Sequence, residues 1–212
     1  PNGPLGGLVL TLILAALGLA MSMPLALLIA LARVSPFGWL RVASKALVNV
    51  VRGMPLLMLI FWAYFVVPKL TGQVVSGFWT LIFALVVYES AYLSEVIRSG
   101  IEAVPRGQIE ASRSLGVGYW TTMRKVVLPQ ALFNVLPSMT SQFVSTIKET
   151  SLGYVISVNE LTFAANQVNN LVLTQPLQVF GILAIIYFLV CFSLSRGLSW
   201  LDLRIRRSRA MA

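Results

Sequence analysis

Apolar residues along this chain are gathered into long runs, and the segments between the runs carry most of the charged residues. Five runs reach or approach the length of about 20 residues that an α-helix needs to cross a hydrocarbon core of about 30 Å. They occupy about residues 8–31, 54–70, 78–97, 132–156 and 179–200. We therefore predict an all-α integral membrane protein with about five transmembrane helices, in which residues 1–212 form a single domain.

Lysine and arginine are distributed unevenly among the connecting segments. Residues 32–53, residues 98–125 and the tail Asp202–Arg209 are rich in them, whereas residues 157–178 contain none. Because cytoplasmic segments carry the excess of positive charge, this pattern places the amino end outside and the carboxyl end in the cytoplasm. The first cationic segment is predicted to be a cytoplasmic loop with an interfacial helix. The tail has a second interpretation, specific binding of anionic lipid, although orientation alone accounts for its charge.

Composition agrees with lipid as the main solvent. Hydrophobic residues make up 58% of the chain and charged residues 11%, and the mean hydropathy is +0.84. A water-soluble domain of this composition would expose large apolar patches. The net charge of +9 does not indicate nucleic-acid binding, since most cations lie just beyond apolar runs and do not line one polar face.

Residues needed for common catalytic and metal chemistry are missing from the sequence. It contains no histidine, and its one cysteine, Cys191, lies within an apolar run, where we expect a small hydrophobic side chain. No Gly-Lys dipeptide occurs, which excludes a phosphate-binding GxxxxGK[ST] loop. We expect no catalytic residue, no metal site and no cofactor in this chain. No basic region precedes the first apolar run, so a cleavable signal peptide is not expected either.

The cytoplasmic connection of residues 101–129 is predicted to form two short helices. Pro105 suits an early helical position, Gln108–Leu115 has helical character, and Gly116 suits the left-handed residue that ends a helix. A second helix is expected over Tyr119–Leu128, with Pro129 ending it.

This connection carries a recognisable motif. Glu110-Ala111-Ser112, Gly116 six residues after the glutamate, and Leu128-Pro129 together resemble the EAA signature of bacterial ABC-importer permeases. Only the third position departs from the signature, with Ser112 in place of alanine. In that family the loop docks into a groove on a separate ATPase subunit. The resemblance thus implies an ATPase-coupling site made of Glu110, Ala111, Ser112, Gly116, Tyr119, Arg124, Leu128 and Pro129.

Further segments resemble the polar amino-acid permeases within that family. They are Arg52 to Leu57, Ile101 through Gly107-Gln108, Lys148 through Ser151-Leu152, and Glu160-Leu161-Thr162. The resemblance implies the type I ABC-importer permease fold in a bacterial cytoplasmic (inner) membrane. It also implies four kinds of partner: two ATPase subunits that bind ATP and Mg, a second permease subunit that is identical or homologous, an extracytoplasmic substrate-binding protein, and a polar amino-acid substrate.

Other functions remain compatible with the residues. The loop can be read as an amphipathic connector on the membrane, with Glu102 and Arg106 as an exposed pair. The chain can be read as an ion-gradient-driven transporter with Glu89 or Glu95 as proton carrier, or as a membrane scaffold that transports nothing. Reconstitution with and without ATPase subunits separates the ATP-driven importer, the gradient-driven transporter and the scaffold.

Polar side chains within the third and fourth runs suggest a substrate path. They recur at helical spacing, and charged groups inside a membrane are costly enough to need a functional explanation. A zwitterionic amino acid needs a cation for its carboxylate and acceptors for its ammonium. The candidates are Glu89, Tyr92, Gln142, Ser145, Lys148 and Glu149. Equally, Lys148 and Glu149 can pair with other helices or lie near the outer surface, and Glu95 and Arg98 can simply anchor the inner end of their helix.

Overall fold

A computed structural model describes residues 7–173 and 175–210, with side chains described as far as residue 204. The described residues are almost entirely helical and form no sheet, which confirms the predicted all-α class. The helices are α1 (Leu8–Val34), α2 (Gly38–Arg52), α3 (Leu56–Phe61), η1 (Trp62–Val66), α4 (Val67–Thr71), α5 (Gly77–Glu102), α6 (Arg106–Ser114), α7 (Tyr119–Thr122), η2 (Met123–Val127), α8 (Leu128–Asn134), α9 (Leu136–Glu149), η3 (Thr150–Ile156), α10 (Leu161–Val172) and α11 (Pro176–Ala210). Elements η1 and η2 are π-helical turns, and η3 is a 3₁₀ helix.

Among the described residues, three helices are long and apolar enough to cross a membrane. They are α1, α5 and α11 over Pro176–Arg204, and they cover the first, third and fifth predicted ranges. The second range, 54–70, corresponds to α3, η1 and α4, which follow α2 after a bend of 98°. The fourth range, 132–156, is divided among α8, α9 and η3. Pro137, which has no N–H to donate, stands in the first turn of α9 just after the break at Val135.

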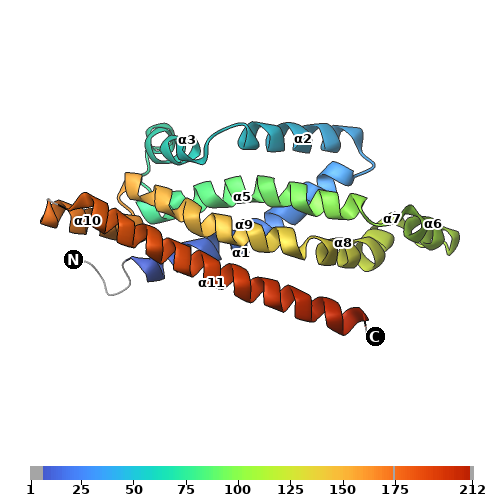
Figure 1. Ribbon diagram of the computed structural model, residues 1–212. Helices are drawn as coiled ribbons and strands as arrows, with labels where there is room; N and C mark the ends of the chain where they lie inside the picture. Colours follow the sequence, from blue (N-terminus) through green and yellow to red (C-terminus); the bar gives the residue numbers. More distant parts are fainter. Residues whose placement is uncertain (1–6, 174, 211–212) are drawn as a thin grey trace.

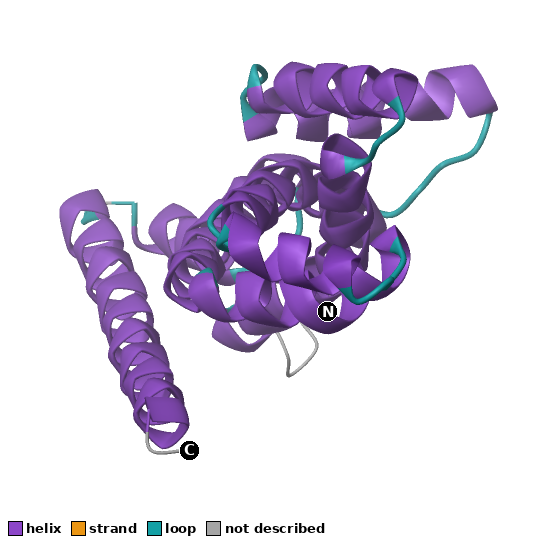
Figure 2. Ribbon diagram, turned by 90° about the vertical axis from the view of Figure 1, so that its right-hand side faces the viewer, coloured by secondary structure: helices purple, strands orange, loops and turns teal. Residues whose placement is uncertain are grey.

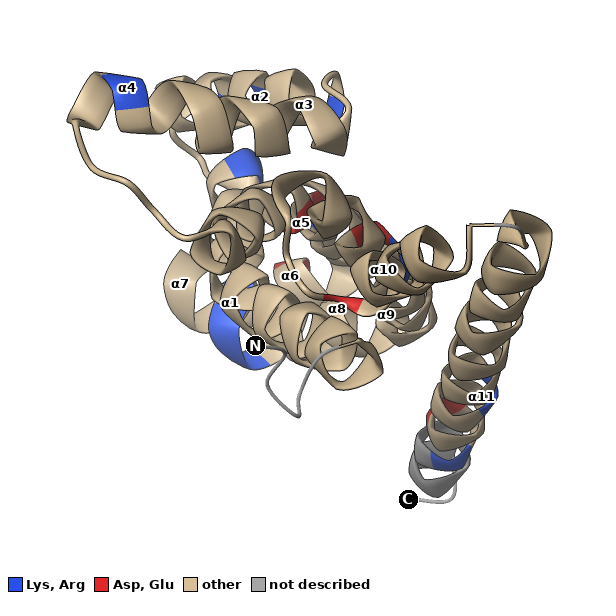
Figure 3. Ribbon diagram, turned by 90° about the vertical axis from the view of Figure 1, so that its left-hand side faces the viewer, with Lys and Arg blue, Asp and Glu red and all other residues tan. Residues whose placement is uncertain are grey.

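The segments predicted to be cytoplasmic lie at one end of the bundle. Figure 1 shows the end of α1, the start of α2, the end of α5, α6, α7 and the carboxyl end of α11 on the right, with α10 and the first turn of α1 on the left. Figure 3 shows how few charged residues the helices carry along their length. Several ends of the cationic segments thus gather at one side of the molecule. The predicted interfacial helix in residues 32–53 is wrong, because α2 runs back alongside α5 and packs on it through Val48 and Val51.

The centre of the bundle is the pairing of α1 with α5. Small residues recur on the buried face of α1, at Ala15, Gly18, Ser22, Ala26 and Ala30, and such residues let helix backbones approach closely in lipid. A Cβ built on Gly18 would lie 3.4 Å from Cβ of Leu85 on α5. Helix α2 packs on the other side of this pair through its buried Val48 and Val51.

Helix α11 lies at the edge of the bundle (Figure 2), where it contacts α9 and α10. None of its most apolar window is buried within the chain, and large side chains such as Ile182, Phe188 and Phe192 are exposed. An apolar helix of this kind is stable in lipid or against another membrane helix, but not in water.

Candidate functional site

The predicted coupling loop folds as a helix with a well-defined end. Helix α6 follows Pro105 and ends at Leu115, and Gly116 has the left-handed φ of 73°. The N–H of Gly116 donates to the carbonyl of Arg113, and that of Val117 donates to the carbonyl of Ser112. These two hydrogen bonds form the Schellman motif, and they confirm the predicted role of Gly116.

The signature residues divide between the surface and the interior. Glu110 and Ala111 are exposed, whereas Ser112 is 7% exposed. The departure from the signature therefore falls at the buried position, and the exposed positions keep the residues of the motif. Glu102 pairs with Arg98 one turn earlier on α5, so the expected pair with Arg106 is not the one the structure shows.

Pro129 does not end the second helix, contrary to the prediction. The helical backbone continues from Tyr119 through α7, η2 and α8 to Asn134. The π-helical turn Met123–Val127 ends two residues before the proline and widens the helix there. The side-chain amide of Gln130 donates to the carbonyl of Val126 across 2.8 Å. Proline usually ends or kinks a helix because it has no N–H to donate. Here the helix continues, and the carbonyl of Val126 accepts a hydrogen bond from a side chain instead.

Tyr119 connects the loop to the first long helix. Its hydroxyl donates to the carbonyl of Val34, 3.1 Å away, and Val34 is the last residue of α1, where carbonyls have no partner within the helix. Burial raises the pKa of the Tyr119 phenol above its ordinary value, so the donor proton is retained. A cavity of about 550 Å³ lies beside this contact, between the ends of α1 and α5 and the elements α6, α7 and η2.

Two large apolar side chains project from the loop. Leu115 is 81% exposed and Trp120 is 59% exposed, next to the exposed Arg124. Met123 and Val127, by contrast, face the interior. The sequence analysis did not include Leu115 or Trp120 in the site. The available signal was a large apolar residue directly before the helix-ending glycine, where burial is not expected.

The structure brings four of the six predicted path residues together between α5 and α9. Glu89 is fully buried; its Oε2 accepts from Nε2 of Gln142 at 2.9 Å, and its Oε1 accepts from the hydroxyl of Thr146 at 2.6 Å. The carboxyl group of Glu149 interacts with that of Glu89, and Glu149 Oε2 is buried with no hydrogen-bond partner among the described residues.

Aromatic groups and an arginine complete this cluster. The hydroxyl of Tyr88 donates to that of Tyr92 at 3.2 Å, and the guanidinium of Arg52 lies 5.0 Å from the centre of the Tyr92 ring. Arg52 and Thr146 were absent from the predicted path. The spacing of Thr146 from Gln142 was a usable signal, since residues four apart share a helix face.

The two remaining predicted path residues are placed differently. Ser145 is half-buried, and Lys148 is exposed. Lys148 stands beside Glu149 in the last turn of α9. The lysine is thus exposed next to the carboxylate cluster and is not buried inside it.

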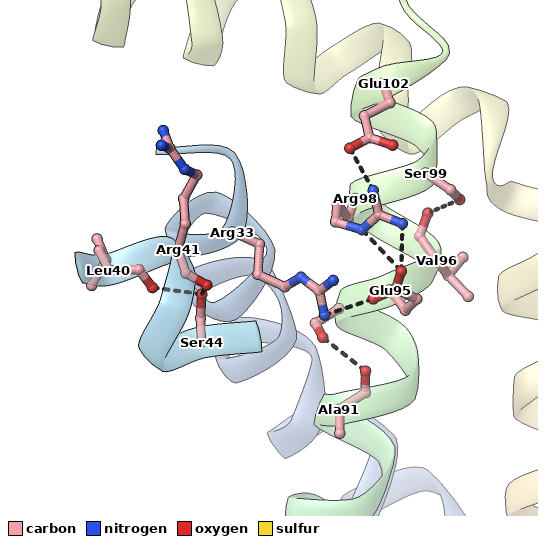
Figure 4. Close-up of polar contacts among 11 residues, drawn as sticks. Arg33, Leu40, Arg41, Ser44, Ala91, Glu95, Val96, Arg98, Ser99 and Glu102 are labelled. Carbon is pink, nitrogen blue, oxygen red and sulfur yellow. Dashed lines mark hydrogen bonds and ion pairs between the residues drawn. The ribbon is translucent and has the colours of Figure 1, made fainter. Parts of the chain in front are cut away.

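A network of ion pairs joins the inner ends of α1 and α5. Figure 4 shows Arg33 and Arg98 converging on Glu95. Nη1 of Arg33 lies 2.8 Å from Glu95 Oε2, Nε of Arg98 donates to Glu95 Oε1 at 2.9 Å, and Arg98 also pairs with Glu102. Glu95 is bound by two arginines, which fits an anchoring role better than that of a free proton carrier.

A second buried carboxylate organises the opposite end of the bundle. Glu160 caps α10 by accepting from the N–H groups of Thr162 at 2.8 Å and Phe163 at 2.7 Å. The hydroxyl of Tyr187 on α11 donates to the same carboxylate at 3.2 Å. Burial raises the pKa of Glu160, and these backbone hydrogen bonds oppose that rise. Glu160 therefore joins α10 to α11 and has a structural role.

Comparison with known proteins adds an independent result. Residues 22–207 match the family described as binding-protein-dependent transport system inner membrane component. The chain is 35% identical over 208 residues to the inner membrane amino-acid ABC transporter permease protein YhdY of Escherichia coli (strain K12), covering 96% of this chain and 57% of that protein. It is 36% identical to the probable glutamine ABC transporter permease protein GlnP of Bacillus subtilis (strain 168), covering 93% of this chain and 91% of that protein.

A solved structure agrees with these relatives. The fold matches a chain of the crystal structure of an amino acid ABC transporter with histidines, with a TM-score of 0.86 and 33% identity, over 93% of this chain and 92% of that chain.

Proposed function

This chain belongs to the family of binding-protein-dependent transport system inner membrane components, and on that premise we propose that it is the membrane-spanning subunit of an ATP-driven importer of polar amino acids. The amino-acid substrate is supported by the names of the relatives, amino-acid and glutamine transporter permeases. The expected site of action is the bacterial cytoplasmic membrane. The expected partners are two ATPase subunits, a second permease and an extracytoplasmic binding protein.

One observation carries the coupling role: helix α6 ends in a defined hydrogen-bonded turn at Gly116, and two of its signature residues, Glu110 and Ala111, are exposed. Glu110 and Ala111 are free to contact a partner, and Leu115 adds a large apolar group beside them. An apolar anchor rimmed by charged residues is typical of a protein–protein contact. We assign this surface to the ATPase subunit, which would bind ATP and Mg.

The loop is joined to the bundle in a way that can transmit movement. Tyr119 bonds to the end of α1, and α8 packs so closely on α5 that a Cβ on Gly100 would lie 2.7 Å from the carbonyl oxygen of Ala131. Movement of the docked loop would therefore displace α1 and α5 together. Closure of the ATPase subunits on nucleotide would rock these helices between outward and inward access.

The carboxylate cluster is the best candidate for the substrate path. Glu89 and Glu149 place two carboxyl groups side by side in an apolar environment, and a cation entering there would relieve their repulsion. An amino acid supplies such a cation as its ammonium group, while Arg52 near Tyr92 is available to its carboxylate. Lys148 has the lesser role of balancing charge from outside the cluster.

Reconstitution tests the importer function. Proteoliposomes containing this chain, the ATPase subunits and the binding protein should accumulate a polar amino acid only when ATP is supplied to the ATPase side. Uptake by the chain alone, driven by a proton gradient, would instead establish the gradient-driven transporter. If the chain neither associated with an ATPase subunit nor transported alone, the non-transporting membrane scaffold would be the remaining function.

A charge reversal tests the docking surface. Glu110→Lys should abolish co-purification of the ATPase subunits, because it places a like charge where the partner is expected to offer a cation. Gln108→Lys introduces the same lysine at another exposed position of α6, with a charge change of one unit instead of two, and should leave association unchanged. Equal behaviour of the two variants would contradict the assigned surface.

A further inference from the structure

A second cavity, of about 500 Å³, lies between the end of α1, the first half of α2 and the end of α5. We propose that it binds the phosphate headgroup of an anionic phospholipid whose acyl chain lies along α2. The residues that line it are Arg33, Arg41, Val42, Lys45, Arg98 and Glu102. The proposal requires that the chain lies in a membrane, but it does not depend on which solute the importer moves.

The charges of the cavity favour an anion. Arg33 and Arg98 are already engaged by Glu95, and Arg98 also by Glu102. Arg41 and Lys45 form no ion pair within the described ranges. Two cations of the lining are therefore left without a carboxylate, and a phosphate group matches that excess.

Arg41 is held in a position suited to this role. Its Nη1 donates to the carbonyl oxygens of Ser35 at 3.0 Å and of Pro36 at 3.3 Å. These contacts fix the side chain at the turn between α1 and α2 and leave its other N–H groups available. Figure 4 shows the side chain extending from α2 away from the ion pairs around Glu95.

An apolar strip beside the cavity indicates a lipid and not a small soluble anion. Val42 lines the cavity and is 70% exposed, and Trp39, one turn earlier, is 72% exposed. Val50, two turns further along the same face, is also exposed. Because α2 runs alongside α5 (Figure 1), this strip leads from the cavity along the direction of a membrane-crossing helix. A phospholipid matches this arrangement, because its anionic headgroup would lie in the cationic cavity and its hydrocarbon chain along the apolar strip.

Native mass spectrometry of the purified permease tests the site. Titration with phosphatidylglycerol and with phosphatidylcholine should show tighter binding of the anionic lipid by about tenfold or more, as expected for two cations near a headgroup. Arg41→Gln/Lys45→Gln should remove this preference. The matched double variant Lys69→Gln/Arg196→Gln, which removes two exposed cations elsewhere, should retain it.

Two further variants separate the site from misfolding and from free phosphate. Because Arg41 also holds a turn, Lys45→Gln alone should weaken phosphatidylglycerol binding about fivefold without lowering the midpoint of thermal unfolding. Val42→Ser should weaken binding of the lipid but not of inorganic phosphate. Equal binding of the two lipids by the unmodified permease, equal losses in the two double variants, or displacement of the lipid by millimolar inorganic phosphate would each overturn the proposal.

Discussion

The hydroxyl of Tyr119 donates to the carbonyl of Val34 across 3.1 Å, although the two residues are 85 positions apart in the sequence. The contact joins α7, the helix that follows the turn at Gly116, to the last residue of α1. It satisfies a carbonyl that the end of α1 would otherwise leave without a protein partner. A side chain of the loop thus becomes part of the termination of a membrane helix.

Tyr119→Phe should lower the free energy of unfolding by about 1 kcal/mol, because it removes one partly buried hydrogen bond and keeps the ring. It should also reduce the amount of amino acid transported per ATP hydrolysed, since α1 would follow the loop less closely. Tyr154→Phe, at an exposed tyrosine, is the matched control. Unchanged coupling in the first variant would show that the contact transmits no movement.

Gly116→Ala should weaken association with the ATPase subunits. Gly116 has a φ of 73°, a conformation that costs an L-residue about 1 kcal/mol or more, and no atom lies within 4 Å of a Cβ built there. Any effect would therefore come from backbone strain and not from a clash. Gly118 has a φ of −66° and equally open surroundings, so Gly118→Ala should bind normally in the same co-purification assay.

Glu89→Gln should reduce uptake by roughly tenfold or more, because the neutral amide no longer offers a charged acceptor for a cationic group. Attachment of the ATPase subunits should be unaffected, since the residue lies far along α5 from the loop. Glu102→Gln makes the same chemical change on the same helix outside the path and should leave uptake near that of the unmodified chain. Normal uptake by Glu89→Gln would exclude the carboxylate cluster from the path.

Gly100→Ala should destabilise the bundle by about 1–3 kcal/mol, the usual cost of overpacking. A Cβ at this position would lie 2.5 Å from Val135 Cγ1 and 2.7 Å from the carbonyl oxygen of Ala131, so α5 and α8 would have to separate. Gly181 on α11 has no atom within 4 Å of its Cβ position. Gly181→Ala should therefore leave the midpoint of thermal unfolding almost unchanged in the same detergent.

Local chemistry accounts for what the sequence predicted well. The Schellman end of α6 depends on one glycine and on hydrogen bonds between neighbours, so Gly116 could be assigned without knowing the fold. Pro129 illustrates the limit of such rules. Its effect on the helix depends on a π-helical turn and on the amide of Gln130, neither of which the proline itself specifies.

The sequence by itself determined the membrane class, the all-helical fold and the short helix that ends at Gly116, because hydropathy and helix ends are properties of neighbouring residues. Only the tertiary structure decided that Thr146 and Gln142 bind Glu89, that Arg33 reaches Glu95, and that Tyr119 reaches Val34. The physical reason is that helical periodicity tells which residues share a face of one helix. Which two faces meet depends on close packing between helices, as at Gly18 and Gly100, where the absence of a side chain lets the backbones approach.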